Sequence, residues 1–218
     1  KGGKAVFLMD IVNSDMPNFQ SVLNTYGVGI KKSIVVESNP NYSTQNPLYL
    51  VPEIGSQEIV SPLKSSNMQV LIPGAQVIET LKLKKSSTTI EPLLTTSKDS
   101  WGKVNLKATN ANKEPGDYDG PFNVAVAITD TLSDGSDNST KLVVVSNGLF
   151  IDADYANVGG NTDFFMNSIN WLQDKKDSIS IRPKSLDSGD LSMNGVQRLL
   201  FSVVTVILIP GIITVLGI

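Results

Sequence analysis

Three polar residues have the types and the spacing to meet around a bound ligand. Asp10 directly follows the apolar run 5–9, and Ser146 and Asn147 directly follow the apolar run 142–145. In open α/β sheets, ligands bind at the carboxyl ends of the strands. If both runs are central, parallel strands, Asp10, Ser146 and Asn147 line one shared crevice. The alternative is that Asp10 and Asn147 only terminate their strands and hydrogen-bond to loop backbone.

A fourth candidate ligand-binding residue is Trp101, which stands in the polar sequence SKDSWGK. An aromatic ring in a polar loop can contact a ligand or a partner protein. The other reading is that the ring folds back onto its own domain. The second tryptophan, Trp171, lies in a sequence with helical periodicity, and we expect it to pack in the core.

The composition excludes several kinds of chemistry. The chain has 218 residues, no histidine, no cysteine and a net charge of −3. Catalytic triads and dyads that need histidine or cysteine are therefore impossible within it, as are zinc sites built from these residues. Nothing indicates nucleic-acid binding. We expect no catalytic residue, no metal site and no cofactor, although catalysis by carboxylates remains formally open.

Two loops look superficially like ligand sites. The sequence 159–163, GGNTD, resembles a phosphate loop but lacks its lysine, and Asn161 is better explained as a helix N-cap. Four loop aspartates could suggest calcium, but no calcium-loop spacing is present and turn chemistry accounts for them. These aspartates are Asp134, Asp137, Asp152 and Asp154.

The elements that must position these residues alternate between strand and helix at both ends of the chain. The strand 5–9 precedes a helix that is capped by Asp15 and closed by Gly27, and a strand at 34–36 follows. The strand 142–145 precedes a helix from Asp163 to Gln173, and a strand at 178–181 follows. Such units predict a parallel sheet with right-handed crossovers.

The middle of the chain reads differently. Residues 38–60 and 105–119 are polar and predict long loops, whereas four stretches read as strands. These stretches are 68–73, 76–83, 91–96 and 122–128. We therefore expect a β-rich insertion inside one domain that spans residues 1–184, followed by a linker over 185–198.

The last twenty residues, 199–218, contain no charged side chain. As an α-helix they would be about 30 Å long, the thickness of a bilayer core. They predict a transmembrane helix that is cut at its C-terminal edge. A buried core helix is the alternative, but Pro210 and Gly211 at its centre are better tolerated in a membrane span.

Several short motifs, taken in order, resemble the GldG-type auxiliary component of ABC transporters, a bacterial family that includes gliding-motility proteins. The likeness is strongest in LVVVSNGLFI (142–151), GNTDFF (160–165) and NSINWL (167–172). It also includes KGGK (1–4), YGV (26–28), LLTTS (93–97) with Trp101, GPF (120–122), IRPK (181–184) and the C-terminal apolar segment with Pro210 and Gly211. The chain departs from the family at Ser146-Asn147, where an acidic Gly-Asp-Ser-like turn is expected. The resemblance therefore gives less support to a ligand-binding carboxylate at this position.

This resemblance implies an α/β domain of flavodoxin-like or amidotransferase-like type, with a mostly parallel sheet, on the extracytoplasmic side of a bacterial membrane. It implies an ABC permease and an ATPase as partners, and a carbohydrate or another small molecule as a ligand. The expected function is non-catalytic binding of a ligand or of partner subunits. Two alternatives are a carboxylate-dependent hydrolase or transferase of a cell-surface substrate, and a purely structural spacer.

Overall fold

The computed structural model describes residues 2–12, 16–131, 139–175 and 202–217. The chain forms two compact units, Lys1–Ile181 and Arg182–Ile218. In the first unit the helices are α1 (Pro17–Thr25), α2 (Ser61–Ser65), the 3-10 helix η1 (Leu149–Ile151) and α3 (Asn161–Leu172). Its strands are β1 (Lys4–Leu8), β2 (Val28–Lys31), β3 (Ile34–Glu37), β4 (Tyr49–Leu50), β5 (Glu53–Ile54), β6 (Ile72–Pro73), β7 (Val77–Thr80), β8 (Thr88–Thr95), β9 (Ser100–Lys103), β10 (Tyr118–Asp119), β11 (Asn123–Thr131) and β12 (Ser139–Val145).

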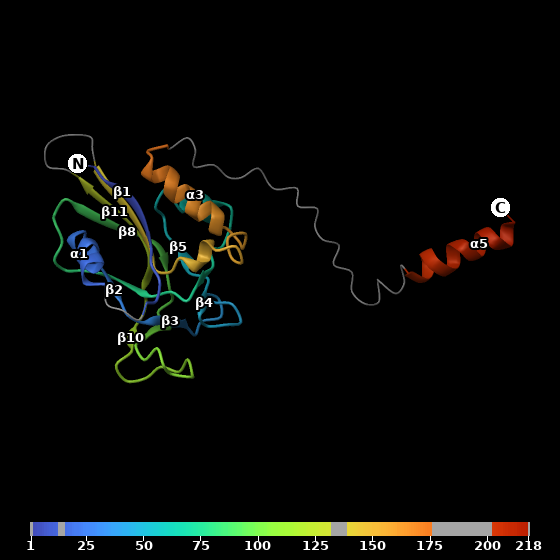
Figure 1. The fold of residues 1–218 in the computed structure, drawn as a ribbon, viewed down its shortest axis with the longest axis horizontal. Coiled ribbons are helices and arrows are strands. Elements are labelled where there is room, and N and C mark those ends of the chain that lie inside the picture. Colours follow the sequence, from blue (N-terminus) through green and yellow to red (C-terminus); the bar gives the residue numbers. More distant parts are fainter. Residues whose placement is uncertain (1, 13–15, 132–138, 176–201, 218) are drawn as a thin grey trace. The chain divides into compact units, whose positions relative to one another are not determined.

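The main sheet is mixed, with the strand order β1-β12-β11-β7-β2 (Figure 1). Strand β8 also pairs with β11, and β5 pairs with β8. Among the described strands of this sheet, β1 and β12 are the parallel pair, and the other pairings are antiparallel. Two small sheets, β10-β9-β3 and β4-β6, complete the unit.

The predicted flavodoxin-like or amidotransferase-like α/β fold with a mostly parallel sheet is wrong. The structure is mostly β, with 31% strand and 22% helix, and its mixed sheet is curled. The predicted parallel crossover is not formed. The strand that follows α1 is β2, which pairs antiparallel with β7 at the far end of the sheet from β1. The predicted next strand, β3, pairs with β9 in a different sheet.

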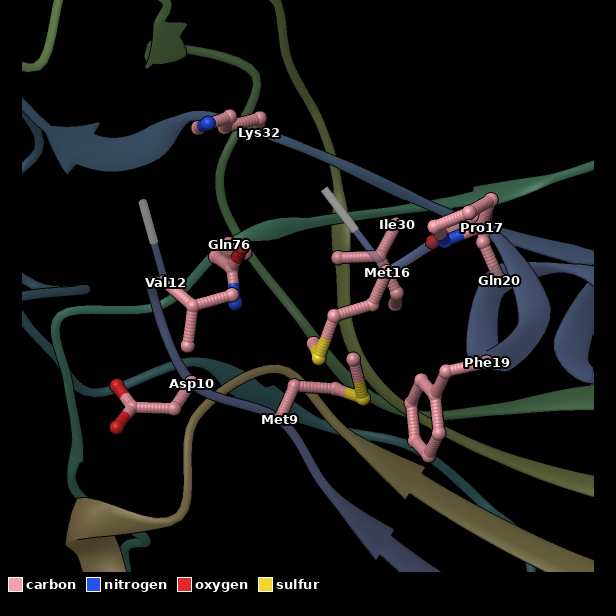
Figure 2. A pocket seen from close by; sticks show the side chains of 10 residues that line it. All are labelled: Met9, Asp10, Val12, Met16, Pro17, Phe19, Gln20, Ile30, Lys32 and Gln76. Atoms are coloured by element: carbon pink, nitrogen blue, oxygen red, sulfur yellow. The ribbon is translucent and has the colours of Figure 1, made fainter. Parts of the chain in front are cut away.

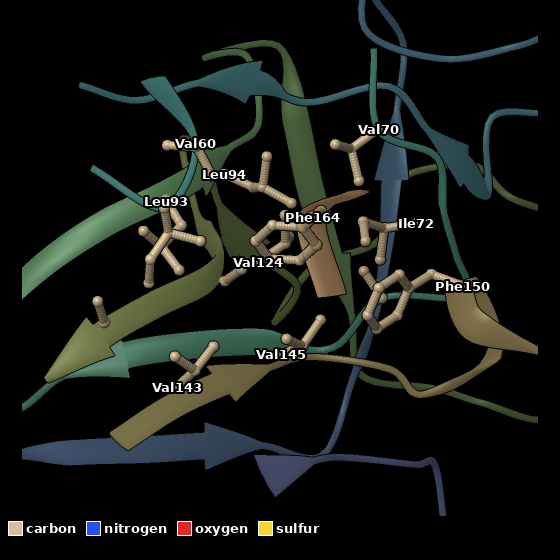
Figure 3. Close-up of a cluster of buried hydrophobic side chains, with 14 of the residues drawn as sticks. Val60, Val70, Ile72, Leu93, Leu94, Val124, Val143, Val145, Phe150 and Phe164 are labelled. Carbon is tan, nitrogen blue, oxygen red and sulfur yellow. The ribbon is translucent and has the colours of Figure 1, made fainter. Parts of the chain in front are cut away.

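Strand β12 forms the centre of the core because it is buried on both faces. Leu142 and Val144 pack on one side of the sheet with Leu23 of α1. Val143 and Val145 pack on the other side with Phe164 of α3, as Figure 3 shows. Side chains of a strand alternate between faces, so an unbroken apolar run needs cover on both. The two helices supply that cover (Figure 1).

Both predicted helices of the first unit are present, with details that differ. Helix α1 has Pro17 in its first turn and ends before Gly27, whose φ of +78° suits the glycine at this position. Val22 is 46% exposed, whereas Leu23 is fully buried. The predicted cap at Asp15 is wrong, since the N-cap residue of α1 is Met16, which makes no side-chain cap hydrogen bond. Helix α2 was not predicted, since residues 38–60 and the sequence after them carry no helical periodicity.

The predicted transmembrane helix over 199–218 is also corrected. The second unit contains a π-helix, η3 (Val204–Leu208), and an α-helix, α5 (Ile209–Leu216). None of the helices in the described part of the chain has the length and apolar character needed to cross a membrane. Pro210 lacks a backbone N–H and clashes with the carbonyl four residues before it, which explains why regular α-helical bonding does not continue through this point.

Several predicted features lie outside the described residues. They are the strand over 178–181, the linker over 185–198, and the aspartates Asp134 and Asp137.

Candidate functional site

The parallel pairing of β1 with β12 brings the predicted site residues to one edge of the sheet. Leu8 pairs with Val145, so Asp10 and Asn147 both lie just beyond the paired ends. The backbone continues this pairing for one more residue. The Met9 N–H donates to the Val145 carbonyl at 2.9 Å, and the Gly148 N–H donates to the Met9 carbonyl at 2.8 Å. Met9 is thereby fixed through both its backbone groups.

Two hollows share Met9 and Asp10 as lining residues. The first, called here the apolar hollow, has a volume of about 320 Å³. It is lined by Met9, Asp10, Val12, Met16, Pro17, Phe19, Gln20, Ile30, Lys32 and Gln76. The second, called here the acidic hollow, has a volume of about 340 Å³. It is lined by Leu8, Met9, Asp10, Asn147, Gly148, Leu149, Ile151 and Asp152.

The floor of the apolar hollow is formed by thioether and hydrocarbon groups. Figure 2 shows the side chains of Met9 and Met16 approaching each other, with Phe19 beside them and the Asp10 carboxylate directed away. Met9 is 5% exposed, whereas Met16 is 43% exposed. Methionine side chains have three rotatable bonds and adapt to occupants of different shapes. Two such side chains therefore line this hollow.

Gln76 lines the apolar hollow and is hydrogen-bonded to the backbone of Ser146. Gln76 is 4% exposed, and its Nε2 donates to the Ser146 carbonyl at 3.3 Å. Ser146 itself is fully buried and lines neither hollow. Its Oγ has no hydrogen-bond partner among the described residues. The structure therefore places the Ser146 side chain inside the core, out of reach of a ligand.

Asn147 lines the acidic hollow, but its amide is used within the chain. Its Nδ2 donates to the Gly74 carbonyl at 2.7 Å, and its Oδ1 accepts the Leu149 N–H at 2.8 Å. Only 2% of the residue is exposed. For Asn147, the geometry matches the alternative interpretation, in which the residue terminates a strand and holds loop backbone.

Two carboxylates remain available at the acidic hollow. Asp10 accepts the Ile11 N–H at 2.7 Å through Oδ1, and Asp152 accepts the Ala153 N–H at 2.6 Å through Oδ1. Both residues are exposed. In the described part of the chain, no lysine or arginine forms an ion pair with either carboxylate. The lining of the acidic hollow therefore carries two carboxylates and no basic side chain.

Trp101 is not part of this site. It lies in β9, pairs with Val36 and Asp119 on the neighbouring strands, and lines neither hollow. Its Nε1 donates to the Ala111 carbonyl at 3.1 Å and its ring is half-buried. The polar end of the ring thus holds the loop before β10, as the alternative interpretation of this residue expects.

The loop 159–163 has a structural role in place of phosphate binding. The Gly160 N–H donates to the Gln69 carbonyl at 2.7 Å, and a Cβ at Gly159 would lie 2.3 Å from the same oxygen. Asn161 does not cap α3, since the N-cap residue is Gly160 and makes no side-chain cap bond. No group of three acidic side chains in the described ranges could hold a metal ion.

Tyr155 lies near the acidic residues of the preceding turn. Its hydroxyl shares a hydrogen bond of 3.1 Å with the hydroxyl of Tyr49. This bond raises the pKa of Tyr155, and the nearby charges of Asp154 and Asp152 raise it further. Both effects favour the neutral form of the phenol.

Sequence reasoning missed three features of this site. Gln76 and Met16 were not singled out, and Asp152 was considered only as a turn residue. Asp152 could have been found from its position seven residues after the apolar run 142–145, whose end was expected to lie beside Asp10. Gln76 carries no comparable signal, because a single buried glutamine resembles any polar residue at a strand start.

Comparison with known proteins agrees in part with the sequence resemblance. A family model described as "ABC-type uncharacterized transport system" matches residues 1–168. Among solved structures, the chain is similar to one described as "mmIFT52 N-terminal domain", with a TM-score of 0.52 and 16% identity. The match covers 78% of this chain and 65% of that chain, so this chain spans less than two thirds of that structure. At such an identity the likeness concerns the fold alone. The curated proteins contain no match.

Proposed function

Since the chain belongs to the family described as ABC-type uncharacterized transport system, we propose that it is a non-catalytic binding subunit that works in one complex with the permease and the ATPase. The match over residues 1–168 makes it an auxiliary component of an ABC transport system, as its motifs predicted. Because ABC transport systems act at membranes, this association indicates that the protein functions at a membrane.

The observation that carries the binding role is the pair of hollows at the edge of the main sheet. They lie where β1 and β12 end, and their rim exposes Leu8, Met16 and Leu149 by 38%, 43% and 42%. Apolar side chains gathered around a hollow and left in contact with water are typical of a surface that another molecule covers.

The proposal of a non-catalytic role rests on the chemistry of the available side chains. The chain has no histidine or cysteine and no P-loop lysine after 159–163. A carboxylate pair used as acid and base needs two environments that push the pKa values apart. Asp10 and Asp152 are both exposed and both accept a backbone N–H, so their environments are alike.

We further propose that the first unit works on the extracytoplasmic side of a bacterial membrane. The support for this is the family and its motifs. A domain on that side can bind a ligand or the outer loops of the permease without competing with the ATPase, which acts in the cytoplasm.

Affinity purification of the complete natural protein from its own membranes tests the proposal. We expect an ABC permease and an ATPase to be recovered together with it. A protein that is purified alone under conditions that preserve other membrane complexes contradicts the proposal. Hydrolase activity that is lost on Asp10→Asn substitution would favour the enzymatic alternative instead.

A further inference from the structure

The apolar and acidic hollows adjoin at Met9 and Asp10 and have complementary chemistry. We propose that together they bind an extended segment of a partner protein in which an apolar side chain neighbours a lysine or arginine. The apolar side chain enters the apolar hollow, and the cationic group lies over Asp10 and Asp152 in the acidic hollow. This inference rests on the proposed binding function and specifies the chemistry of the partner.

The apolar hollow is large enough for an apolar side chain. Its volume is about 320 Å³. Met9, Met16 and Phe19 give it a lining of polarisable and hydrocarbon groups. Displacing water from such a lining stabilises the complex in proportion to the apolar area that is covered. The flexible thioethers let different aliphatic or aromatic side chains fit.

The acidic hollow selects positive charge. Asp10 and Asp152 each use one oxygen for a backbone N–H, and no second bond to their other oxygens is made by the described residues. Lysine and arginine are absent from the lining of the acidic hollow, whereas Lys32 lines the apolar hollow. A basic side chain of the partner is therefore favoured at the acidic hollow over the apolar one. The charge pattern sets the orientation of the segment.

Gln76 provides a hydrogen-bond acceptor beside the apolar hollow. Its Nε2 donates to the Ser146 carbonyl, whereas its Oε1 accepts no hydrogen bond from the described residues. Only 4% of Gln76 is exposed. Covering this oxygen without supplying a donor would weaken binding. A backbone N–H of the bound segment would satisfy it. A peptide offers such a donor next to every side chain except proline.

The shape of the surface favours a protein segment over a small free ligand. The rim residues Leu8 and Leu149 flank the acidic hollow and Met16 flanks the apolar hollow, each more than a third exposed. A small molecule inside either hollow would leave this rim in water. A partner chain that crosses both hollows covers it, which is the usual arrangement of an interface with an anchor side chain and a surrounding rim.

Methionine methyl NMR on the 218-residue chain in detergent tests the proposal directly. Of the five methionines, Met9 and Met16 line the apolar hollow, and Met68 and Met166 serve as internal references. The probe is the peptide Gly-Ser-Leu-Lys-Ser-Gly, with Leu-Glu and Gly-Lys versions as controls. We expect the Leu-Lys peptide to shift the Met9 and Met16 methyl signals and to leave Met68 and Met166 unchanged.

Matched variants separate the two hollows. The double variant Asp10→Asn/Asp152→Asn should weaken binding of the Leu-Lys peptide roughly fivefold, as expected for two exposed charge pairs, and high salt should remove this difference. Met16→Ser should also weaken it. The control variants Asp99→Asn and Leu83→Ser change exposed residues outside both hollows and should have no effect.

Three results would overturn the inference. They are unchanged Met9 and Met16 signals at millimolar peptide, equal binding of the Leu-Glu peptide, and tighter binding of n-hexylammonium, which would indicate a small amine as the occupant.

The affinity purification distinguishes failure of this inference from failure of the proposed function. If the permease and ATPase are recovered equally well with the wild-type protein and with the double variant, the function stands and the docking site is wrong.

Discussion

The carboxamide of Asn161 pairs with the backbone of Leu71 in both directions. Its Oδ1 accepts the Leu71 N–H at 2.8 Å, and its Nδ2 donates to the Leu71 carbonyl at 3.0 Å. The side chain thus acts like an additional strand residue beside the chain that leads into β6. The same Nδ2 lies within hydrogen-bond distance of the Phe150 and Tyr155 carbonyls. One fully buried amide therefore joins α3, η1 and the middle of the chain.

Replacing this amide should destabilise the first unit strongly. We expect Asn161→Ala to lower the free energy of unfolding by about 3 kcal/mol, because it leaves buried backbone groups without partners. Urea denaturation followed by circular dichroism measures this. Asn41→Ala is the matched control, since Asn41 is exposed, and it should change stability by less than about 0.5 kcal/mol. Equal stability of the two variants would contradict the role of Asn161.

The glycine pair before α3 gives a second test. A Cβ at Gly159 would lie 2.3 Å from the Gln69 carbonyl oxygen, and the φ of Gly159 is +54°. Gly159→Ala should therefore cost about 3 kcal/mol or more, from the contact and the backbone conformation together. Gly116 also has a positive φ, +97°, but a Cβ at this position would have nothing within 4 Å. Gly116→Ala should cost only about 1 kcal/mol.

These two alanine variants separate close packing from backbone conformation. If both lose equal stability in thermal melts, the approach of Gln69 to the loop is not what requires glycine at position 159. In either case, we expect that inorganic phosphate or ATP will not protect the Gly159→Ala variant from unfolding, because the loop lacks a P-loop lysine and the Gly160 N–H is used by the Gln69 carbonyl.

Acid should weaken the junction between α3 and the sheet. Hydrogen bonds from Lys141 and Lys4 lower the pKa of Asp174 from 3.8 to about 2. Because the pKa is lower in the folded state, the stabilisation is complete above about pH 4 and is lost as the pH falls through 2. Asp174 is half-exposed, so the contribution is below about 1 kcal/mol. Asp174→Asn should remove this part of the pH dependence in urea titrations between pH 2 and 6, whereas Asp99→Asn should keep it.

Asp130 adds to the same dependence on pH. Its burial would raise the pKa, but the hydrogen bond from Ser87 and the ion pair with Lys85 outweigh this and lower it. Its carboxylate therefore also favours the folded state above its ordinary pKa. In the Asp174→Asn variant, the free energy of unfolding should therefore still change with pH between 2 and 6, but less steeply than in the wild type. A flat profile would show that Asp130 contributes nothing.

A single cysteine introduced into these 218 residues, which contain none, can report the proposed sidedness once any cysteine elsewhere in the complete protein has been replaced by serine. Leu83 is 91% exposed, so Leu83→Cys introduces an accessible thiol into a sequence that has none. We expect a membrane-impermeant maleimide to label this variant of the complete natural protein in intact cells. Labelling that requires permeabilised cells would contradict the extracytoplasmic location. Leu23→Cys is the control, because Leu23 is fully buried and should be labelled only after unfolding.

The sequence predicted the strongest local elements of the fold but not their assembly. The run 142–145 is so apolar that it must be covered on both faces, and β12 is. Helix α1 likewise has Pro17 in its first turn and Gly27 just after its end, both of which mark helix boundaries in the sequence. Pairing, by contrast, depends on contacts between distant residues. Nothing local in residues 34–36 indicates that β3 leaves the main sheet to pair with β9, and so the parallel sheet was predicted wrongly.

The candidate site was predicted to a similar extent. The positions of Asp10 and Asn147 at one edge follow from the two strand ends, and the parallel pairing of β1 with β12 brings them together. The orientation of side chains could not be predicted. Ser146 points into the core and Asn147 holds the Gly74 carbonyl, because the alternation along β12 and the loop before β7 decide these directions.

Met9 and Asp10 line both hollows, so the two hollows meet at one wall. The Met9 backbone is held by Val145 and Gly148, which leaves its side chain as the adjustable part of that wall. If the apolar and the cationic group of the proposed segment both bind here, linkage requires that each changes the affinity for the other by the same factor.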